Sequence, residues 1–252
     1  MIQTIDHGVI RELRLARPPV NALSPELIVA LKKAIQAAPG DGARALILSG
    51  SPGRFSGGLD VPLLLGFDRP AMAALWRDFY ALLGAIACSS IPIVAAITGH
   101  APAGGTVLAL FCDLRVMASG DYKIGLNEVP VGIPIPPVIL AGARRLVGPR
   151  LAERLAVSGE FLSPQDALGF GMIDEVVALE KVVDRAVERC RRLLALPAEA
   201  MASTRRLARA DLVAIFAADL EPELQRVVAS WWSAETQESL RALAERLRKK
   251  TG

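Results

Sequence analysis

The segment from 91 to 136 constrains the fold of this chain more than any other, because it alternates strand, glycine-rich and helical patterns. A short apolar run at 93–97 follows Pro92 and predicts a buried strand. The next residues, GHAPAGG, predict a turn, and they lead directly into the apolar helical segment TVLALFC. Gly104 and Gly105 therefore stand at a helix entrance, where glycine lets the backbone approach a ligand and leaves N–H groups pointing at it.

After this helix the pattern returns to a strand, LRVMA, and then to the loop KIGLNEVPVGIP. That loop holds one carboxylate, Glu128, among apolar neighbours. Two interpretations fit these residues. In the first, the glycines are tight-turn residues and Glu128 is a surface charge. In the second, the glycine turn and Glu128 belong to one ligand site.

The sequence GHAPAGGTVLALFCD followed by IGLNEVPVGIP resembles the crotonase superfamily of enoyl-CoA hydratases and isomerases. Its PAGG and GLNE variants are most similar to the Δ3,Δ2-enoyl-CoA isomerases of the mitochondrial type. The resemblance runs through nearly the whole chain in colinear order, strongly from Arg17 to Pro136 and more weakly after Leu179. It implies an α/β fold, a spiral of ββα units followed by a helical C-terminal region.

Composition sets broad limits. A chain of 252 residues that is 52% apolar and 22% charged suits one globular domain, or one domain with an appendage, and excludes disorder. A formal charge of +3 tolerates an anionic ligand but gives no argument for nucleic acid. The three widely spaced cysteines predict neither disulfides nor a metal site and favour a reducing cytoplasm. Polar and helix-breaking residues interrupt the apolar region 91–117, so we expect no membrane span, and nothing after Met1 indicates a signal peptide.

Shorter patterns predict the other elements. Alternating residues at 2–15 predict a strand pair, and 45–48 a short buried strand. Three helices should begin after N-cap residues that have a proline close behind them, namely Ser24, Asp68 and Ser163. Strand and helix patterns alternate up to this point, which favours an α/β layout.

From Leu179 onward three helical patterns dominate, ending with ETQESLRALAERLRKK. We therefore divide the chain into an α/β core at 1–178 and a helical region at 179–252. The resemblance implies that this region covers the active site and packs between the subunits of a trimer. The pair Trp231-Trp232 and the apolar stripe exceed what one small lid needs, so we expect a homo-oligomer. The resemblance implies that it is a homotrimer or a dimer of trimers.

The segment SGSPGRFSGGLD is neither a Walker loop nor a dinucleotide fingerprint, because no Gly-Lys-Ser/Thr follows it and its glycines miss the required spacing. It resembles the FSxGLD element of the crotonase family. The resemblance makes the backbone N–H groups of Leu59 and Gly104 the two halves of an oxyanion hole. It also places four neighbouring residues at the substrate, namely Ser56, Gly57, Gly58 and Asp60.

The segment ARPPVNAL resembles the crotonase loop that lies along the CoA moiety through backbone contacts and a nearby basic residue. The resemblance makes Arg17 the basic residue and puts Ala22 in the substrate contact. The alternative is that Arg17, at the edge of a loop, is only solvated.

The resembled hydratases carry two glutamates, one in the helix after the glycines and one at the equivalent of Glu128. Val107 stands at the first position here, and we expect it to face the substrate. A single carboxylate suits a 1,3 proton shuttle, which moves a double bond from position 3 to position 2. Apolar neighbours (Val107, Val129 and Ile133) should raise the pKa of Glu128 toward neutrality, where one group can act as both base and acid.

The sequence therefore predicts a Δ3,Δ2-enoyl-CoA isomerase that acts on an acyl-CoA thioester, with no metal and no cofactor beyond the coenzyme A of the substrate. An enoyl-CoA hydratase, or another crotonase-type enzyme with a second polar group from elsewhere, is the nearest alternative. His100 is the one histidine near the turn, and we expect it to bond to the backbone or pack in the core. A catalytically silent scaffold that binds CoA esters or RNA is the remaining alternative, although no basic and aromatic patch supports RNA.

Overall fold

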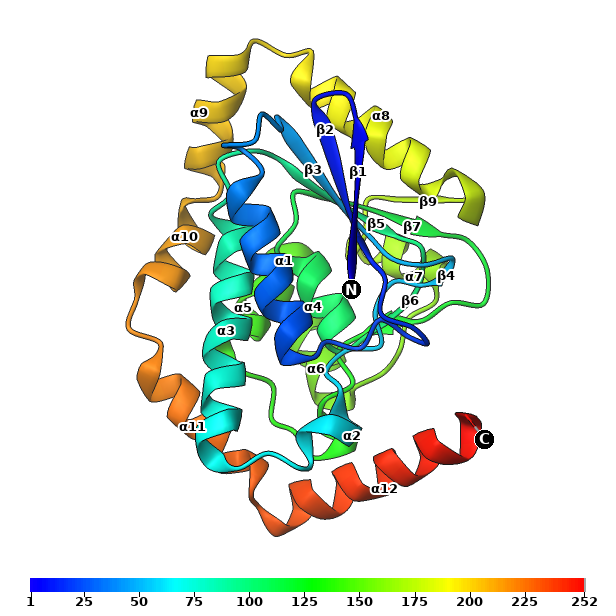
Figure 1. The fold of residues 1–252 in the computed structure, drawn as a ribbon, viewed down its shortest axis with the longest axis vertical. Coiled ribbons are helices and arrows are strands. Elements are labelled where there is room, and N and C mark those ends of the chain that lie inside the picture. The colour runs from blue at the N-terminus through cyan, green and yellow to red at the C-terminus, as the bar shows by residue number, and fades with distance from the viewer. Residues whose placement is uncertain (252) are drawn as a thin grey trace.

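The computed structural model describes the backbone of residues 1–251 and the side chains of residues 1–249. Its strands form two sheets (Figure 1). The larger sheet contains, in spatial order, β1 (Ile2–His7), β2 (Ile10–Leu15), β3 (Ala45–Ser49), β5 (Ile93–Ile97), β7 (Leu114–Ala118) and β9 (Glu175–Val177). The smaller sheet contains β4 (Gly53–Arg54), β6 (Gly99–Pro102) and β8 (Ile124–Gly125). Strands β1 and β2 are antiparallel, and the other neighbours are parallel.

A ββα unit is repeated in the part of the chain before residue 178. The helices of this part are α1 (Pro25–Ala37), α2 (Val61–Leu64), α3 (Arg69–Ala87), α4 (Gly104–Leu110), α5 (Pro137–Val147), α6 (Pro149–Ser158) and α7 (Pro164–Gly169). In three successive units the first strand joins the larger sheet, the second joins the smaller sheet, and a helix follows. These units are β3-β4-α3, β5-β6-α4 and β7-β8-α5. The expected α/β spiral of ββα units is confirmed.

Both faces of the larger sheet are covered, which explains why its central strands read as unbroken apolar runs. In β3, Leu46 and Leu48 face the main core with α1, α3, α4 and α5, whereas Ala45 and Ile47 face the opposite side. That opposite side is covered by α8 (Val182–Leu194), whose buried residues pack in a second core. Helix α8 therefore packs on the sheet, although it follows residue 178.

The predicted helix starts are confirmed by their caps. The side chains of Ser24, Asp68 and Ser163 each accept a hydrogen bond from the backbone N–H three residues later. Each helix has a proline in its first turn. The capped helices α1 and α3 lie side by side over the larger sheet (Figure 1), and α3 supplies one wall of the site described below.

One prediction in the central segment is wrong. Residues 99–102, expected in a turn, form β6, which pairs with Gly53–Arg54 on one side and Ile124–Gly125 on the other. The actual turn is therefore reduced to Ala103. The partners of β6 lie far away in the sequence, so a local glycine and proline signal could not identify this short strand.

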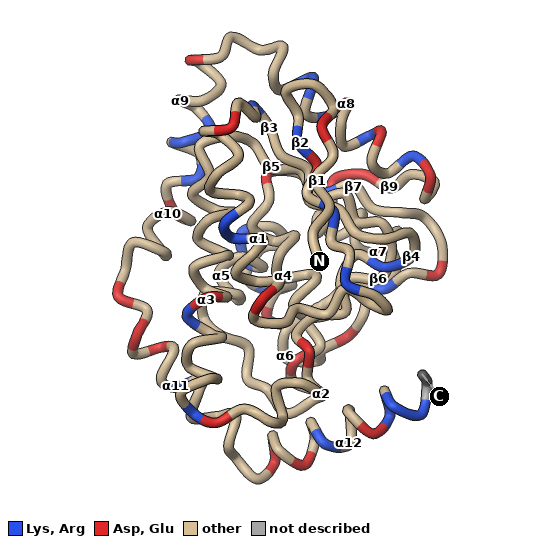
Figure 2. Tube along the Cα trace, in the orientation of Figure 1, with Lys and Arg blue, Asp and Glu red and all other residues tan. Residues whose placement is uncertain are grey.

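The C-terminal region contains more helices than the three expected patterns. Besides α8 it has α9 (Ala198–Ala208), α10 (Ala210–Ala217), α11 (Glu221–Trp231) and α12 (Ala234–Thr251), and it begins with a 3-10 turn, η2 (Leu179–Lys181). Another 3-10 turn, η1 (Val129–Val131), lies in the α/β core. Helices α9, α10 and α11 pass along the side of α3, and α12 runs along the lower edge (Figure 1). Basic and acidic residues alternate along α8 and α12 (Figure 2). Among the described helices, none is long and apolar enough to cross a membrane.

The tryptophan pair of the tail packs within the chain itself. Trp231 is buried at 3% exposure, and the ring of Trp232 lies under the guanidinium of Arg69 at 4.8 Å. These two side chains therefore already have intramolecular partners, which removes the reason the sequence offered for assigning them to a subunit interface.

Candidate active site

A cavity of about 540 Å³ lies between the glycine-rich segments, α3 and α12. Its walls are mainly apolar and include Val61, Trp76, Phe79, Val107, Ile133 and Ile139. The two segments singled out by the sequence meet here, because Gly57 and Leu59 from one and Gly104 from the other also line it. An apolar cavity with a few convergent polar groups is the usual form of a small-molecule site.

Glu128 is the only carboxylate among the described residues that line this cavity. The residue is 8% exposed and directly precedes η1, and its Oε2 atom has no hydrogen-bond partner in the described part of the chain. Burial raises the pKa of Glu128 to about 7, and its own backbone N–H opposes this rise. The predicted elevation is therefore confirmed, and the group can gain or lose a proton near neutral pH.

The apolar environment of Glu128 differs from the prediction in one residue. Val107 and Ile133 line the cavity as expected, whereas Val129 is 44% exposed and lies outside the lining. Val131 lines the cavity instead, because the three residues per turn of the 3-10 turn η1 point Val129 and Val131 in different directions, about 120° apart around its axis.

The backbone N–H groups of Leu59 and Gly104 are close together. A Cβ added to Gly104 would lie 3.4 Å from the Leu59 nitrogen and 3.1 Å from the Gly58 Cα. Gly104 is the first residue of α4, where N–H groups have no intrahelical acceptor and the helix dipole favours negative charge. A β-bridge between Leu59 and Leu23 holds the other donor in place. Neither N–H has a backbone acceptor among the described residues. Two such donors at the mouth of an apolar cavity can bind a developing oxyanion.

The turn that presents Gly104 has a strained backbone. Ala103 has φ 47° and ψ −118°, a conformation that non-glycine residues rarely adopt. Gly58, directly opposite, has φ 81°, and a Cβ there would lie 3.1 Å from the Ala103 Cβ and from the Gly104 nitrogen. Glycine at 58 therefore lets the two loops touch without a steric clash.

Arg17 and Asp60, both predicted to contact substrate, are paired with each other. The Arg17 Nη2 atom donates to Asp60 Oδ2 at 2.6 Å, and Nη1 donates to the Ala22 carbonyl at 3.1 Å. Asp60 also caps α2 through the Leu63 N–H. None of Arg17, Ala22 and Asp60 lines the cavity. The structure thus brings these three together beside Leu59, and their contact with substrate stays a prediction.

Asn21 joins the two predicted substrate loops and was missed by the sequence analysis. It is 1% exposed, with φ 53°, and its Nδ2 donates to the carbonyls of Arg54 and Phe55. The hydroxyl of Ser56 donates to the Asn21 carbonyl at 2.9 Å and accepts from the Gly58 N–H. Ser56 is therefore buried beneath the loop and outside the cavity lining, and its contact with substrate stays a prediction. The positive φ of an asparagine gives no sequence signal by itself, so only the long-range bonds identify it.

Three polar residues complete the description of the site. Trp76 Nε1 and Asn127 Oδ1, both from residues that line the cavity, are buried without partners in the described part of the chain. His100 lies outside the lining, where its Nδ1 accepts from the Lys123 N–H at 3.2 Å and its ring meets Tyr122 edge-on. The expected backbone role of His100 is confirmed.

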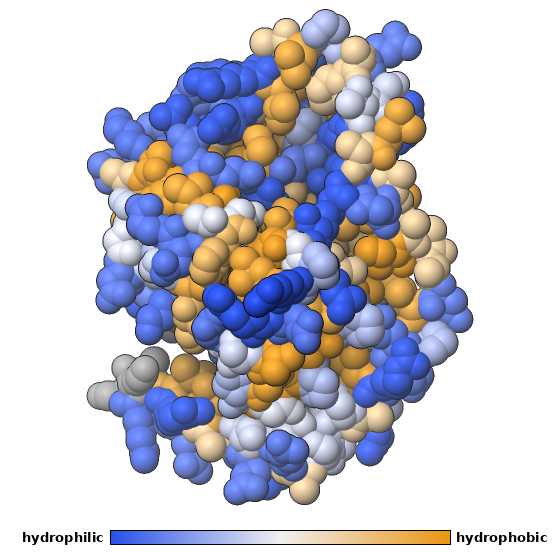
Figure 3. Space-filling view, turned by 180° about the vertical axis from the view of Figure 1, so that it is seen from behind, coloured by the Kyte–Doolittle hydropathy of each residue, from blue (hydrophilic) through white to orange (hydrophobic). Residues whose placement is uncertain are grey.

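Helix α12 forms the outer wall of the cavity. Leu243, Arg246 and Leu247 line it from this helix, and the Thr236 hydroxyl donates to the Gly132 carbonyl just after η1 at 2.5 Å. In the view from behind, a notch separates α12 from the body of the molecule (Figure 3). The last helix is thus tied at one end to the segment that carries Glu128.

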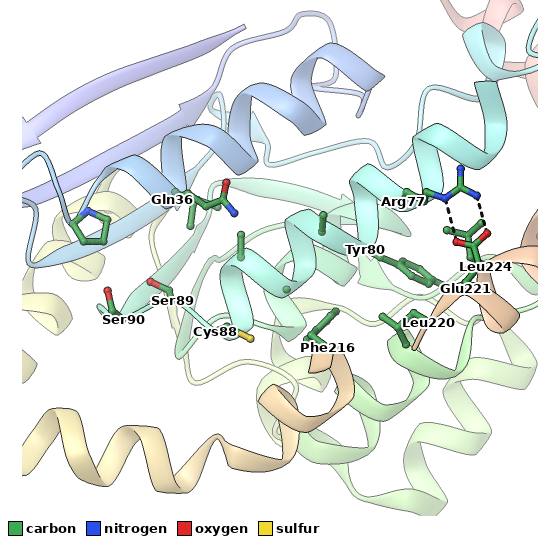
Figure 4. Close-up of a pocket in the computed structure, with 15 residues that line it drawn as sticks. Gln36, Arg77, Tyr80, Cys88, Ser89, Ser90, Phe216, Leu220, Glu221 and Leu224 are labelled. Atoms are coloured by element: carbon green, nitrogen blue, oxygen red, sulfur yellow. Dashed lines mark hydrogen bonds and ion pairs between the residues drawn. The ribbon is translucent and has the colours of Figure 1, made fainter. Parts of the chain in front are cut away.

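A larger hollow of about 650 Å³ lies elsewhere, between α1, α3, α10 and α11 (Figure 4). Its charged lining residues in the described chain are Arg77 and Glu221, and these form a two-point ion pair at 2.7 and 3.2 Å. Tyr80 also lines it, but its hydroxyl donates to the buried Glu223. Cys88 lines it as well, but burial raises the pKa of its thiol above the ordinary value, so this group is no base at neutral pH. The charged groups of this hollow are paired, and the cavity of Glu128 is the better candidate.

Comparison with known proteins agrees with this geometry. The family model for enoyl-CoA hydratase/isomerase matches residues 5–251. The mouse mitochondrial enoyl-CoA delta isomerase 1 is 32% identical over 255 residues, covering 100% of this chain and 88% of the relative. A probable enoyl-CoA hydratase of Mycobacterium avium is 38% identical over 212 residues, covering 81% of this chain and 78% of the relative.

The solved structure of the human mitochondrial delta3-delta2-enoyl-CoA isomerase superposes with a TM-score of 0.94 at 31% identity. The match covers 100% of this chain and 99% of the human one. Relatives of both reaction types thus share the fold and most of the length. The chain belongs to the enoyl-CoA hydratase/isomerase family.

Proposed function

We propose that this enzyme is a Δ3,Δ2-enoyl-CoA isomerase. The observation that carries the proposal is the single carboxylate of Glu128, which faces an apolar cavity with two backbone N–H donors at its mouth. Its pKa of about 7 lets it take up and return a proton at neutral pH. The mouse and human isomerases among the relatives support the same reaction.

In the proposed mechanism, the thioester oxygen of a 3-enoyl-CoA accepts hydrogen bonds from the N–H groups of Leu59 and Gly104. Ionised Glu128 removes a proton from C2, and the C–H electron pair moves into a dienolate whose negative oxygen these donors stabilise. The protonated Glu128 then returns the proton to C4. The C3=C4 bond becomes C2=C3, the carbonyl re-forms, and the carboxylate is regenerated, so no other reactant is needed.

Val107 favours isomerisation over hydration. It is fully buried in the cavity wall, at the α4 position where the resembled hydratases carry their other glutamate. Without a second carboxylate, an attacking water has one base and no acid partner on the opposite side. Hydration remains the second candidate, because one relative is a probable hydratase and the Asn127 amide lies beside Glu128 in the lining.

The deciding experiment supplies 3-enoyl-CoA and 2-enoyl-CoA separately and follows the absorbance of the conjugated thioester. We expect 3-enoyl-CoA to be conjugated quickly and 2-enoyl-CoA to be hydrated slowly. If 2-enoyl-CoA is hydrated faster than 3-enoyl-CoA is conjugated, the protein is a hydratase and the proposal is wrong. Binding without either reaction would favour a silent CoA-ester scaffold.

We also propose that the protein forms a homotrimer or a dimer of trimers. Helix α9 has no buried residue among its described side chains, and Leu207 on it is 76% exposed. Light scattering should give three or six times the 26.8-kDa mass of one chain. We expect Leu207→Glu to lower this mass, while Val157→Glu on α6, at a position 68% exposed, should leave it unchanged. A monomeric mass for the parent would contradict the proposal.

A further inference from the structure

The hydroxyl of Thr106 lies between two strands of the smaller sheet. It accepts a hydrogen bond from the Gly125 N–H at 2.8 Å and donates to the Ala101 carbonyl at 2.5 Å, with the Gly125 carbonyl at 3.1 Å as the alternative acceptor. Ala101 belongs to β6 and Gly125 to β8. Thr106 itself is fully buried in the first turn of α4. One side chain therefore connects a helix with two strands.

These three elements carry the two halves of the proposed catalytic apparatus. Gly104, two residues before Thr106, supplies an oxyanion donor from the start of α4. Glu128, three residues after Gly125, supplies the base from the segment that leaves β8. The Ala103 N–H also donates to the Gly125 carbonyl at 2.9 Å, so the strained turn and β8 meet at the same residue. Thr106 closes the link on the helix side.

We propose that Thr106 is a positioning residue that fixes the distance between the oxyanion donor and the base. The inference rests on the proposed function of Glu128 and Gly104. Proton transfer depends steeply on this distance, since a displacement of about 1 Å can cost roughly 100-fold in rate. The strands β6 and β8 have four and two residues, so few ladder hydrogen bonds hold them. A side-chain bridge is therefore a large part of what keeps them in register.

The strained backbone at Ala103 gives a second reason for this tie. A residue held at φ 47° relaxes unless its surroundings fix it. Hydrogen bonds of Thr106 and Ala103 converge on Gly125, and a Cβ on Gly105 would lie 2.7 Å from the Ser56 carbonyl, so the turn is packed from below as well. Loss of the hydroxyl leaves the packing and the Ala103 bond to Gly125 but removes the side-chain link between α4 and β8.

The test compares Thr106→Val, which keeps the shape, with Thr106→Ser, which keeps the hydroxyl. We expect Thr106→Val to lower kcat by about 10- to 100-fold with little change in KM, because the ligand pocket stays and the alignment is lost. Thr106→Ser should recover most of kcat. Thr106→Ala is the second hydroxyl-free variant, and it should behave like Thr106→Val.

The matched control is Ser49→Ala. The Ser49 hydroxyl is equally buried and donates to Glu12 at 2.6 Å, but it lies in β3 away from the cavity. We expect Ser49→Ala to lower the denaturation midpoint and leave kcat unchanged. A loss of kcat in Ser49→Ala that matches Thr106→Val at equal loss of stability would overturn the inference, because destabilisation alone would then explain the result.

A readout that needs no turnover separates this inference from the proposed function. The Glu128 carboxyl can be titrated by carbon-13 NMR in each variant. We expect the pKa of Glu128 to fall from about 7 toward the ordinary range in Thr106→Val, since a loosened β8 admits water. In Ser49→Ala it should remain at about 7. If the parent fails to isomerise but this shift occurs, the positioning role stands and the isomerase proposal fails. Folded Thr106→Val with parental kcat and parental titration would refute the positioning role.

Discussion

Two buried glutamates, in different regions of the molecule, differ in the hydrogen-bond partners of their carboxylates. Glu12, in β2, accepts hydrogen bonds from His7 at 3.0 Å, Arg14 at 2.9 Å and Ser49 at 2.6 Å. Glu128 is also buried, yet one of its carboxyl oxygens has no partner among the described residues.

The pKa values of the two groups move apart for this reason. Burial by itself raises the pKa of Glu12, but the bonds from Ser49, His7 and Arg14 outweigh it and leave the pKa lowered. For Glu128 burial dominates, and the pKa rises to about 7. A carboxylate with three side-chain partners is held ionised and stabilises the sheet, whereas a buried one with an unpartnered oxygen can exchange protons. The side-chain donors that oppose burial at Glu12 therefore distinguish it from Glu128, where burial dominates the pKa.

The largest difference should appear in activity. Glu128→Gln keeps the size of the side chain and removes the base, so isomerisation should fall by about 10²- to 10⁴-fold while CoA-ester binding persists. Glu12→Gln should retain the parental kcat. Initial rates at equal folded concentration and a binding titration would measure both. Turnover of Glu128→Gln within a few-fold of the parent would remove this residue from the mechanism.

The second difference concerns the pH dependence of stability, and the two groups should have opposite signs. Between pH 4.5 and about 7 folded Glu128 is protonated while unfolded Glu128 is ionised, so the folded chain binds more protons and loses stability as pH rises. The loss reaches about 3 kcal/mol. Glu128→Gln should abolish this slope in denaturant titrations from pH 5 to 8.

Glu12 should act below that window. Its stabilisation is present above pH 4.5 and is lost as pH falls through its lowered folded pKa. The Glu12→Gln variant should therefore lose less stability than the parent as pH falls below 4.5. Above pH 5 its stability should still fall with rising pH, as in the parent. If both variants gave the same profile, the contrast between the two regions would be wrong.

At neutral pH, Glu12→Gln should cost about 1–3 kcal/mol, because an amide can accept on one oxygen only and presents its own N–H groups to donors. Glu128→Gln should be neutral or stabilising there, since it removes a buried group that is partly charged and has an unpartnered oxygen. Denaturation midpoints at pH 7 measure both effects. A larger loss in Glu128→Gln than in Glu12→Gln would contradict this ranking.

The sequence predicted those elements that are determined by residues close together in the chain. The apolar runs of β3, β5 and β7 and the caps Ser24, Asp68 and Ser163 follow from neighbouring residues, and each is present. Glu128 was found because it is the one acid in its loop. The repeated ββα unit gave no detectable sequence repeat, since its second strands have only two to four residues.

What the sequence could not predict depends on partners far along the chain. Glu12 alternates in a strand like any polar residue, and its three donors come from β1, β2 and β3 together. Asn21 and Thr106 likewise act through bonds to residues up to 35 positions away. For the same reason, Arg17 and Asp60 were assigned separately to substrate although they form an ion pair.

The smallest effect is expected for a substitution that adds a second carboxylate to the cavity. Val107 is fully buried in the lining, one helical turn after Gly104, so Val107→Glu would place a new acid in the cavity that contains Glu128. Two carboxylates can hold and activate a water between them, and we expect slow but measurable hydration of 2-enoyl-CoA. The gain should be modest, because the new charge has no built partner and the surrounding packing is apolar.

The matched control for this change is Val107→Gln, which has similar size and polarity but no base. Loss of 2-enoyl-CoA absorbance at equal folded concentration should be faster in Val107→Glu than in either Val107→Gln or the parent. Equal rates in the two variants would mean that extra space or polarity admits water, and that the number of carboxylates does not set the reaction type. A rate that also requires Glu128, tested by Glu128→Gln in the Val107→Glu background, would establish that the two acids act on one water. The difference between Glu12 and Glu128 would then also bear on the reaction type, because the carboxylate introduced at position 107 would promote hydration only together with Glu128.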